Sequence, residues 1–196
     1  MFIVKPTKEQ IETARKLAEY SVEHHPIHDI YENFHKDSFG LSGKERSKQY
    51  RFRGTLGEIL FADRYGLPRP GRSFGAEDGQ DNGTDFVLNG KHIDVKTMRR
   101  TGHFYNPEIC VFNLSKRQVM KESSETDYYF GITLIEKDGE ITDAWFHGFI
   151  PRRDVEEKGT FYKSGSVVKN NAGREIHHDE DTYEVLFKHF KTDIQP

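Results

Sequence analysis

The sequence predicts an α/β fold in which a mixed β-sheet is flanked by helices. Three observations predict it: two helical patterns lie in the first 65 residues, an Asn-Gly hairpin signal follows at positions 89–90, and a strongly apolar strand pattern covers 127–136. Helical and strand segments in this order favour layers of helices packed against a sheet. The length of 196 residues suggests one domain.

Composition and charge restrict the classes of function. The chain contains 34% hydrophobic and 13% aromatic residues, which is enough to build a core. Its net charge of −3 argues against a surface that binds polyanions broadly, although a local basic groove remains compatible with it. No apolar run approaches about 18 residues, and Cys110 is the single cysteine. We therefore expect a cytoplasmic protein without a membrane segment or an intrachain disulfide.

Two helices are predicted before the hairpin. Residues 7–24 carry an apolar stripe, and Thr7 with a glutamine three residues later fits a capping box. Residues 42–65 begin with a second capping box, Ser-Gly-Lys-Glu, and end before Gly66, with a proline close behind. The segments on either side of this second helix, 25–41 and 67–83, are expected to be irregular.

The remaining elements are predicted mostly as strands. Pro151 is expected to begin a short turn or helix, and Asp138-Gly139 a second hairpin turn. The expected strands are 84–89, 91–98, 108–113, 127–136 and 140–150, with weaker candidates at 161–168 and 183–187 and a short helix at 115–121.

The hairpin at Asn89-Gly90 sets the register of the residues on either side. A type I′ turn at this dipeptide places Asp85 opposite Asp94, and side chains alternate between faces along a strand. Lys96 then shares the face of the two aspartates, while the opposite face is apolar. Like charges directly across a strand pair repel one another. A cation between the two carboxylates would turn this repulsion into an ion site.

The spacing Asp85…Asp94-Val95-Lys96 resembles the signature of the PD-(D/E)xK nuclease superfamily. This superfamily includes restriction endonucleases, junction resolvases and repair nucleases. The proline that usually precedes the first aspartate is Thr84 in this chain. The resemblance implies a restriction-endonuclease-like mixed β-sheet core.

Many members of the superfamily add a glutamate on a preceding helix, and Glu58 has the position to supply it. Its neighbours Gly54 and Gly57 are costly inside a helix, so we expect the helix backbone to approach the sheet or a substrate closely there. The resemblance covers residues 42–150. It leaves 1–41 as an N-terminal helical extension and 151–196 as a C-terminal elaboration of one nuclease domain.

These residues suggest metal-assisted hydrolysis. Ligands that are all oxygen atoms suit Mg²⁺ or Mn²⁺, which polarise a phosphate and activate a bound water. The resemblance implies Asp85, Asp94, Glu58 and the Val95 carbonyl as metal ligands, and Lys96 as the catalytic cation. Two alternatives remain: an ion-pair cluster in which Lys96 neutralises an aspartate on a solvated face, and a related fold that has lost its activity.

Basic and polar side chains near this site are candidates for nucleic-acid binding. Several lie on the predicted second helix, where aromatic residues are interleaved, and others follow Lys96 or open the helix at 115–121. For each, a solvated surface role is the alternative. The candidates are Lys44, Lys48, Arg51, Arg53, Arg99, Arg100, Lys116, Arg117 and Gln118.

The functional hypothesis is a Mg²⁺-dependent DNA endonuclease. Cutting both strands of a duplex with one small site per chain suggests a homodimer. The alternatives are a structure-selective or RNA-cleaving nuclease, and an inactive nucleic-acid-binding or assembly module of the same fold.

Overall fold

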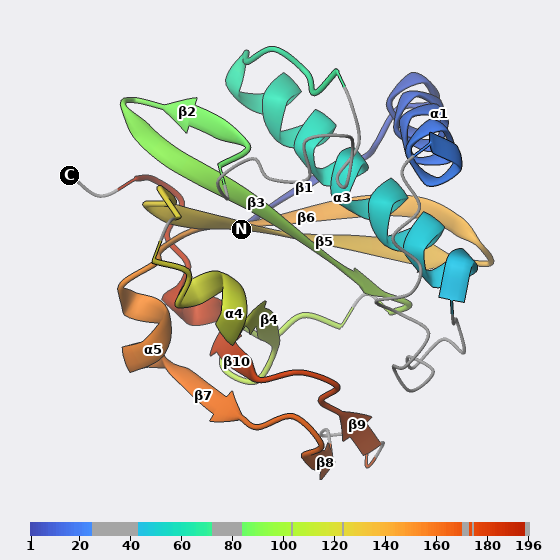
Figure 1. The fold of residues 1–196 in the computed structure, drawn as a ribbon. Coiled ribbons are helices and arrows are strands. Elements are labelled where there is room, and N and C mark those ends of the chain that lie inside the picture. Colours follow the sequence, from blue (N-terminus) through green and yellow to red (C-terminus); the bar gives the residue numbers. More distant parts are fainter. Residues whose placement is uncertain are drawn as a thin grey trace.

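The computed structural model describes residues 1–24, 43–71, 84–102, 104–122, 124–169, 173 and 175–194. A central mixed sheet is covered on one face by the long helices α1 (Lys8–His24) and α3 (Gly43–Tyr65). The other face carries a second layer of short helices and strands (Figure 1). The predicted α/β class with helices on a mixed sheet is therefore confirmed. None of the helices in the described ranges is long and apolar enough to cross a membrane.

The central sheet has five strands in the described part of the chain, in the order β1-β6-β5-β3-β2. Strand β3 runs parallel to β5, and the other neighbours are antiparallel, which makes the sheet mixed. The edge strand β1 was not predicted from the sequence. The strands are β1 (Phe2–Val4), β2 (Phe86–Leu88), β3 (Lys91–Arg100), β5 (Tyr128–Lys137) and β6 (Glu140–Pro151).

The helix ends follow the predicted local rules. The Thr7 amide donates to Gln10 Oε1 at 2.8 Å, and the Gln10 amide donates to Thr7 Oγ1 at 3.2 Å, which confirms the first capping box. Helix α3 ends before Gly66, whose φ of +66° allows the Leu67 amide to reach the Ala62 carbonyl at 2.8 Å. The Ser42 cap and the predicted irregular segment 25–41 lie outside the described residues, as does most of 67–83.

Both predicted hairpin turns are confirmed. Asn89 and Gly90 have φ values of 52° and 74°, and Asp138 and Gly139 have 52° and 83°. The first turn pairs Leu88 with Lys91, and the register continues to Phe86 opposite Ile93, as the sequence predicts.

The second layer differs more from the expectation. The predicted strand 108–113 begins later, because the Cys110 amide turns back to the Asn106 carbonyl at 2.8 Å. The predicted strand 161–168 is interrupted by a turn at Gly165, where φ is +85°. The elements of this layer are β4 (Val111–Ser115), α4 (Lys116–Val119), α5 (Asp154–Lys158), β7 (Gly159–Tyr162), β8 (Val167–Lys169), β9 (Glu175–His177), β10 (Thr182–Leu186) and the 3₁₀ turn η1 (Phe187–His189).

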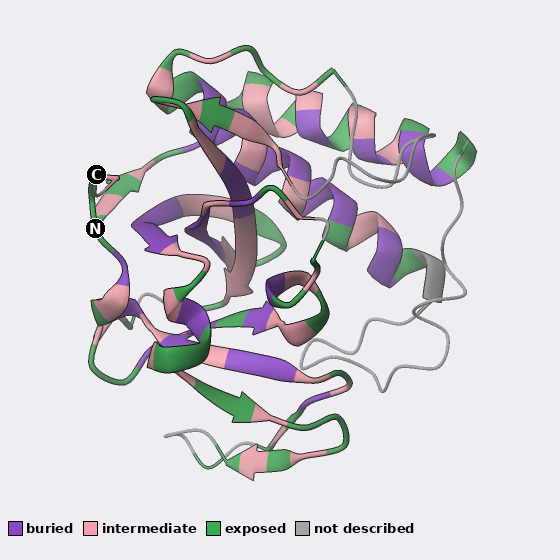
Figure 2. Ribbon diagram, turned by 60° about the vertical axis from the view of Figure 1, so that its left-hand side comes forward, coloured by how far each residue is buried: buried purple, intermediate pink, exposed green. Residues whose placement is uncertain are grey.

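Apolar cores on both faces enclose the central strands. On β5, Tyr128 and Phe130 face α1 and α3, while Tyr129 faces the second layer together with Ile150 of β6. Figure 2 shows buried positions along these central strands. The face that carries Asp94 is thus covered by protein rather than open to solvent, in contrast to the solvated face that the ion-pair alternative assumed.

Candidate metal and active site

The candidate site lies at the open end of the β2–β3 hairpin. Beyond Ile93, no strand in the described part of the chain pairs with the outer edge of β3. Asp85 takes that place: its amide donates to the Ile93 carbonyl at 2.9 Å, and its Oδ2 accepts the Val95 amide at 2.7 Å. The Asp85 side chain is therefore held at the edge of β3 by the backbone of the residue that follows Asp94.

Asp94 and Lys96 lie on the face of β3 that packs against the second layer. Their neighbours in the register of β5 are Tyr129 and Gly131, and a Cβ at Gly131 would contact Phe112. Lys96 Nζ lies 2.7 Å from Asp94 Oδ1, with side-chain exposures of 22% and 7%. Because desolvation of both charges is costly, this ion pair alone is a weak source of stability.

The carboxylates at this site interact unfavourably. Burial raises the pKa of Asp85 well above its ordinary value, and the negative charges of Asp94 and Glu58 raise it further. Lys96 and the Val95 amide oppose this change in part. Burial lowers the pKa of Lys96, but Asp94 and Asp85 outweigh it, so the net shift is upward. Asp85 thus lies among negative charges that Lys96 offsets only in part, which is an environment that favours an added cation.

Helix α3 brings Glu58 to the sheet through a close contact at Gly57. A Cβ on Gly57 would lie only 2.0 Å from Thr97 Oγ1 of β3, so the predicted close approach is confirmed at this glycine. At Gly54 no described atom lies within 4 Å of the corresponding position, so the approach to the sheet is not found there, and the approach to a substrate stays a prediction. Glu58 follows Gly57 directly and is half-buried.

The donor atoms at the site fit Mg²⁺ or Mn²⁺. Asp85 and Asp94 supply carboxylates, and Val95 directs its carbonyl to the same edge as its amide, toward Asp85. No group of three or more His, Cys, Asp or Glu side chains among the described residues is already arranged to hold a metal ion. Mg²⁺ usually takes one or two carboxylates and keeps waters in its shell, so Asp85, Asp94 and the Val95 carbonyl are donors of the kind that it needs.

Tyr129 is a candidate site residue that the sequence reasoning missed. It is 1% exposed, and its hydroxyl has no hydrogen-bond partner among the described residues. Burial and the Asp94 charge raise the pKa of Tyr129 to about 12. Its position depends on the pairing of β3 with β5, which are far apart in sequence, and no local signal predicts that register.

Arg51 and Arg53 of α3 are not available for phosphate contact. Arg51 is 1% exposed and donates from Nη1 to Ser21 Oγ of α1. Arg53 is 5% exposed and lies 3.6 Å from Glu136 of β5, which Arg99 also contacts at 2.5 Å. The structure therefore corrects the assignment of Arg51 and Arg53 to a nucleic-acid surface, because their charges are used inside the protein.

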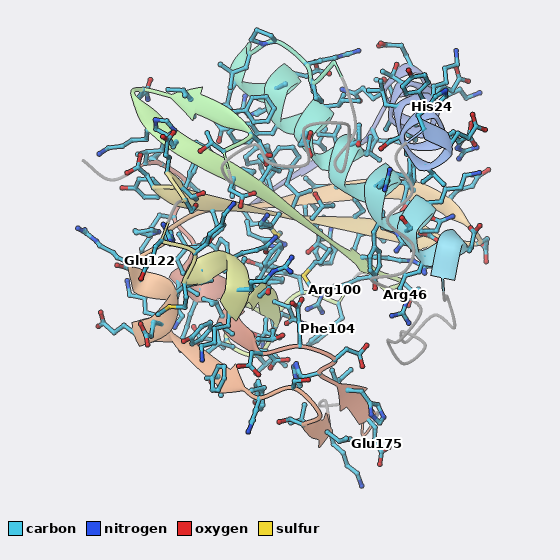
Figure 3. All side chains as sticks on the ribbon, viewed as in Figure 1. His24, Arg46, Arg100, Phe104, Glu122 and Glu175 are labelled. Carbon is cyan, nitrogen blue, oxygen red and sulfur yellow. The ribbon has the colours of Figure 1, made fainter. Side chains whose placement is uncertain are left out.

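Arg100 also has an internal role. Its Nη2 donates to the Val111 carbonyl at 3.2 Å, and its guanidinium lies 5.4 Å from the centre of the Phe187 ring. Figure 3 shows Arg100 on the side of the sheet where β4 lies. Arg100 thus joins the end of β3 to the second layer.

Three of the candidates for nucleic-acid binding keep exposed cationic groups. Lys48 is 40% exposed and pairs with Glu19 at 3.1 Å, Lys116 is 41% exposed and pairs with Asp181 at 3.7 Å, and Arg117 is exposed. The Lys116 amide donates to the Asp181 carbonyl at 2.8 Å, so this helix amide is not available to a phosphate. Gln118 is half-buried, and the Lys44 side chain lies outside the described residues.

Comparisons with protein-family models, with curated proteins and with solved structures found no significant match to this chain. The function must therefore be inferred from the residues at the site.

Proposed function

We propose that this protein is a Mg²⁺- or Mn²⁺-dependent nuclease of the PD-(D/E)xK type, acting on DNA as an endonuclease. The observation that supports it most is the arrangement at the open end of the β2–β3 hairpin, which we call the fork and which carries Asp85, Asp94 and Lys96. There Asp85 is bound to the Val95 amide at 2.7 Å, and Asp94 lies beside Lys96 at 2.7 Å. Residues that match the signature in sequence thus also lie next to one another at one end of the hairpin.

Each group at the site has a separate role in the proposed reaction. Asp85, Asp94 and the Val95 carbonyl would hold the metal ion, with Glu58 at the helix–sheet contact as an auxiliary ligand. The ion supplies polarisation of the phosphate and an activated water. Lys96 stays protonated, because the neighbouring aspartates raise its pKa, and it is suited to stabilise negative charge that develops on the phosphate.

A phosphodiester polymer is the substrate that suits this arrangement. Exposed Lys48, Lys116 and Arg117 offer cationic groups for its backbone, which suits sequence-independent phosphate contacts. We extend the proposal to a homodimer for double-strand cleavage, because each chain provides one candidate site.

The test is cleavage by the wild type and by Asp94→Asn, which keeps the side-chain shape and removes its charge. Supercoiled, linear, single-stranded and branched DNA, and RNA, are incubated with Mg²⁺, with Mn²⁺ and with chelator. We expect metal-dependent cleavage of DNA by the wild type and a loss of about 10²–10³-fold or more in Asp94→Asn. Asp138→Asn is the matched control, because Asp138 lies at the other hairpin turn and asparagine tolerates its positive φ.

The outcomes separate the alternatives. Cleavage restricted to branched DNA or to RNA would replace the DNA endonuclease with the corresponding nuclease. Nucleic-acid binding without metal-dependent cleavage would favour an inactive binding module. Equal cleavage by the wild type and Asp94→Asn, with both proteins folded, would refute the assigned site.

A further inference from the structure

Tyr129 is the nearest neighbour of Asp94 on the adjacent strand. The two residues are paired in the parallel register of β3 and β5, and both side chains lie on the face that packs against the second layer. The pairing continues with Lys96 opposite Gly131, where the rings of Phe190 and Phe112 take the space of a side chain. Tyr129 therefore borders the Asp94–Lys96 pair from within the protein.

The Tyr129 hydroxyl is costly where it lies. It is buried without a hydrogen-bond partner among the described residues, and an unsatisfied buried polar group costs about 1–3 kcal/mol. A phenylalanine would fill the same apolar surroundings without this cost. The hydroxyl is thus better explained by a partner that it gains in another state of the site than by packing.

Asp94 can supply that partner once a cation is bound. Its Oδ1 lies 2.7 Å from Lys96 Nζ. A carboxylate has two oxygens and about four acceptor positions, and carboxylates that ligate metals are in turn fixed by hydrogen bonds from neighbouring groups. A cation at Asp85 and Asp94 competes with Lys96 for Asp94, and a carboxylate that turns toward the cation can accept from a second donor with its remaining acceptor positions.

We infer that Tyr129 is a positioning residue for the metal site, whose hydroxyl donates to the Asp94 carboxylate, directly or through one water, when Asp94 binds the cation. This inference rests on the metal site of the proposed function. It adds a residue from β5 to a site otherwise built from α3 and the β2–β3 hairpin. A protonated phenol hydroxyl is a suitable donor to a carboxylate oxygen.

The test compares Tyr129→Phe with Tyr128→Phe. The control carries the same substitution on the next residue, whose side chain faces the opposite core. Each protein is titrated with Mg²⁺ and with Mn²⁺ while its thermal unfolding is followed, and DNA cleavage is measured separately. We expect Tyr129→Phe to need about 10–100-fold more metal for half-saturation, and Tyr128→Phe to match the wild type. Without metal, Tyr129→Phe should unfold at the same temperature as the wild type or higher.

Each result decides the inference. An unchanged metal requirement in Tyr129→Phe would overturn it, and a lower unfolding temperature without metal would make Tyr129 a structural residue. The metal titration does not depend on cleavage. A wild type that binds metal but cleaves no nucleic acid would therefore refute the proposed nuclease activity, and the titration would still decide the role of Tyr129. A wild type that binds no metal would overturn both.

Discussion

The hairpin fork and the first half of α3 are both rich in charged residues. At the fork like charges repel one another, whereas in α3 the charged side chains have partners inside the protein. At the fork, burial and the nearby charges of Asp94 and Glu58 raise the pKa of Asp85. In α3, by contrast, buried arginines contact partners: Arg51 binds Ser21 of α1, and Arg53 lies 3.6 Å from Glu136 of β5. Repulsion at the first region suits the binding of a cation, whereas the contacts at the second hold the fold together.

The arginines of α3 connect this helix to three separate parts of the molecule. Arg46, labelled in Figure 3, is 1% exposed and lies 3.9 Å from Asp179, between β9 and β10. With Arg51 directed to α1 and Arg53 to β5, these three side chains reach three different parts of the protein. A basic helical segment is therefore weak evidence for a nucleic-acid surface until its packing is known.

The largest stability effect is expected at Arg51. Arg51→Ala should lower the free energy of unfolding by about 2–4 kcal/mol, because it removes a buried side chain and leaves Ser21 Oγ without this donor. Urea denaturation measures the change. The matched control is Lys48→Ala one turn earlier, where an exposed pair with Glu19 should contribute less than about 0.5 kcal/mol.

If Arg51 instead served a nucleic-acid surface, its replacement would weaken DNA binding without loss of stability. A stable Arg51→Ala protein with reduced affinity for DNA would show that Arg51 serves binding and not the stability of the fold.

The next effect is expected at Gly57, where α3 meets β3. Gly57→Ala should cost about 1–3 kcal/mol, because its Cβ would overlap Thr97 Oγ1. Adding Thr97→Ala removes that atom, so the double variant should regain much of the stability in a double-mutant cycle. Gly54→Ala is the control and should be stabilising by about 0.5–1 kcal/mol, since no described atom lies near its Cβ position.

A failure of Thr97→Ala to rescue Gly57→Ala would mean that the cost arises elsewhere on the helix. The contact at Gly57 would then not explain how Glu58 is held beside the hairpin.

Local signals predicted the parts of the fold that depend on neighbouring residues. The Thr7 capping box, the Gly66 helix end and the two hairpin turns are all confirmed, because each depends on residues a few positions apart. The strand β1 and the split between β7 and β8 depend on partners that are distant in sequence. No short pattern marks them.

The candidate site divides in the same way. The turn at Asn89-Gly90 fixes the register as far as Phe86 opposite Ile93. Asp85 then leaves the ladder and binds the Ile93 carbonyl and the Val95 amide instead of pairing with Asp94, so the sequence predicted its neighbourhood but not its exact position. Glu58 and Gly57 could be suggested from helix composition. Tyr129 could not, because its place depends on the parallel pairing of β3 with β5. The buried arginines were misassigned because charge composition does not reveal internal partners.

The smallest effect expected is at Asp85, and it has the opposite sign to that at Arg51. With chelator at neutral pH, Asp85→Asn should raise the free energy of unfolding by on the order of 1 kcal/mol. The variant keeps an oxygen to accept the Val95 amide and removes the repulsion from Asp94 and Glu58. Urea denaturation of both proteins across a range of pH measures the difference.

The pH dependence follows from the direction of the shift. Because the folded pKa of Asp85 lies above its usual 3.8, the folded state binds this proton more tightly than the unfolded state. The stabilising contribution is complete below the unfolded pKa and is lost as the pH rises through the folded pKa. The advantage of Asp85→Asn should therefore shrink toward acidic pH, and added Mg²⁺ should stabilise the wild type more than the variant. If Asp85→Asn were less stable than the wild type at neutral pH with chelator, the carboxylate would be stabilised by its partners. The charges at the fork would then stabilise the fold, as the buried arginines of α3 do.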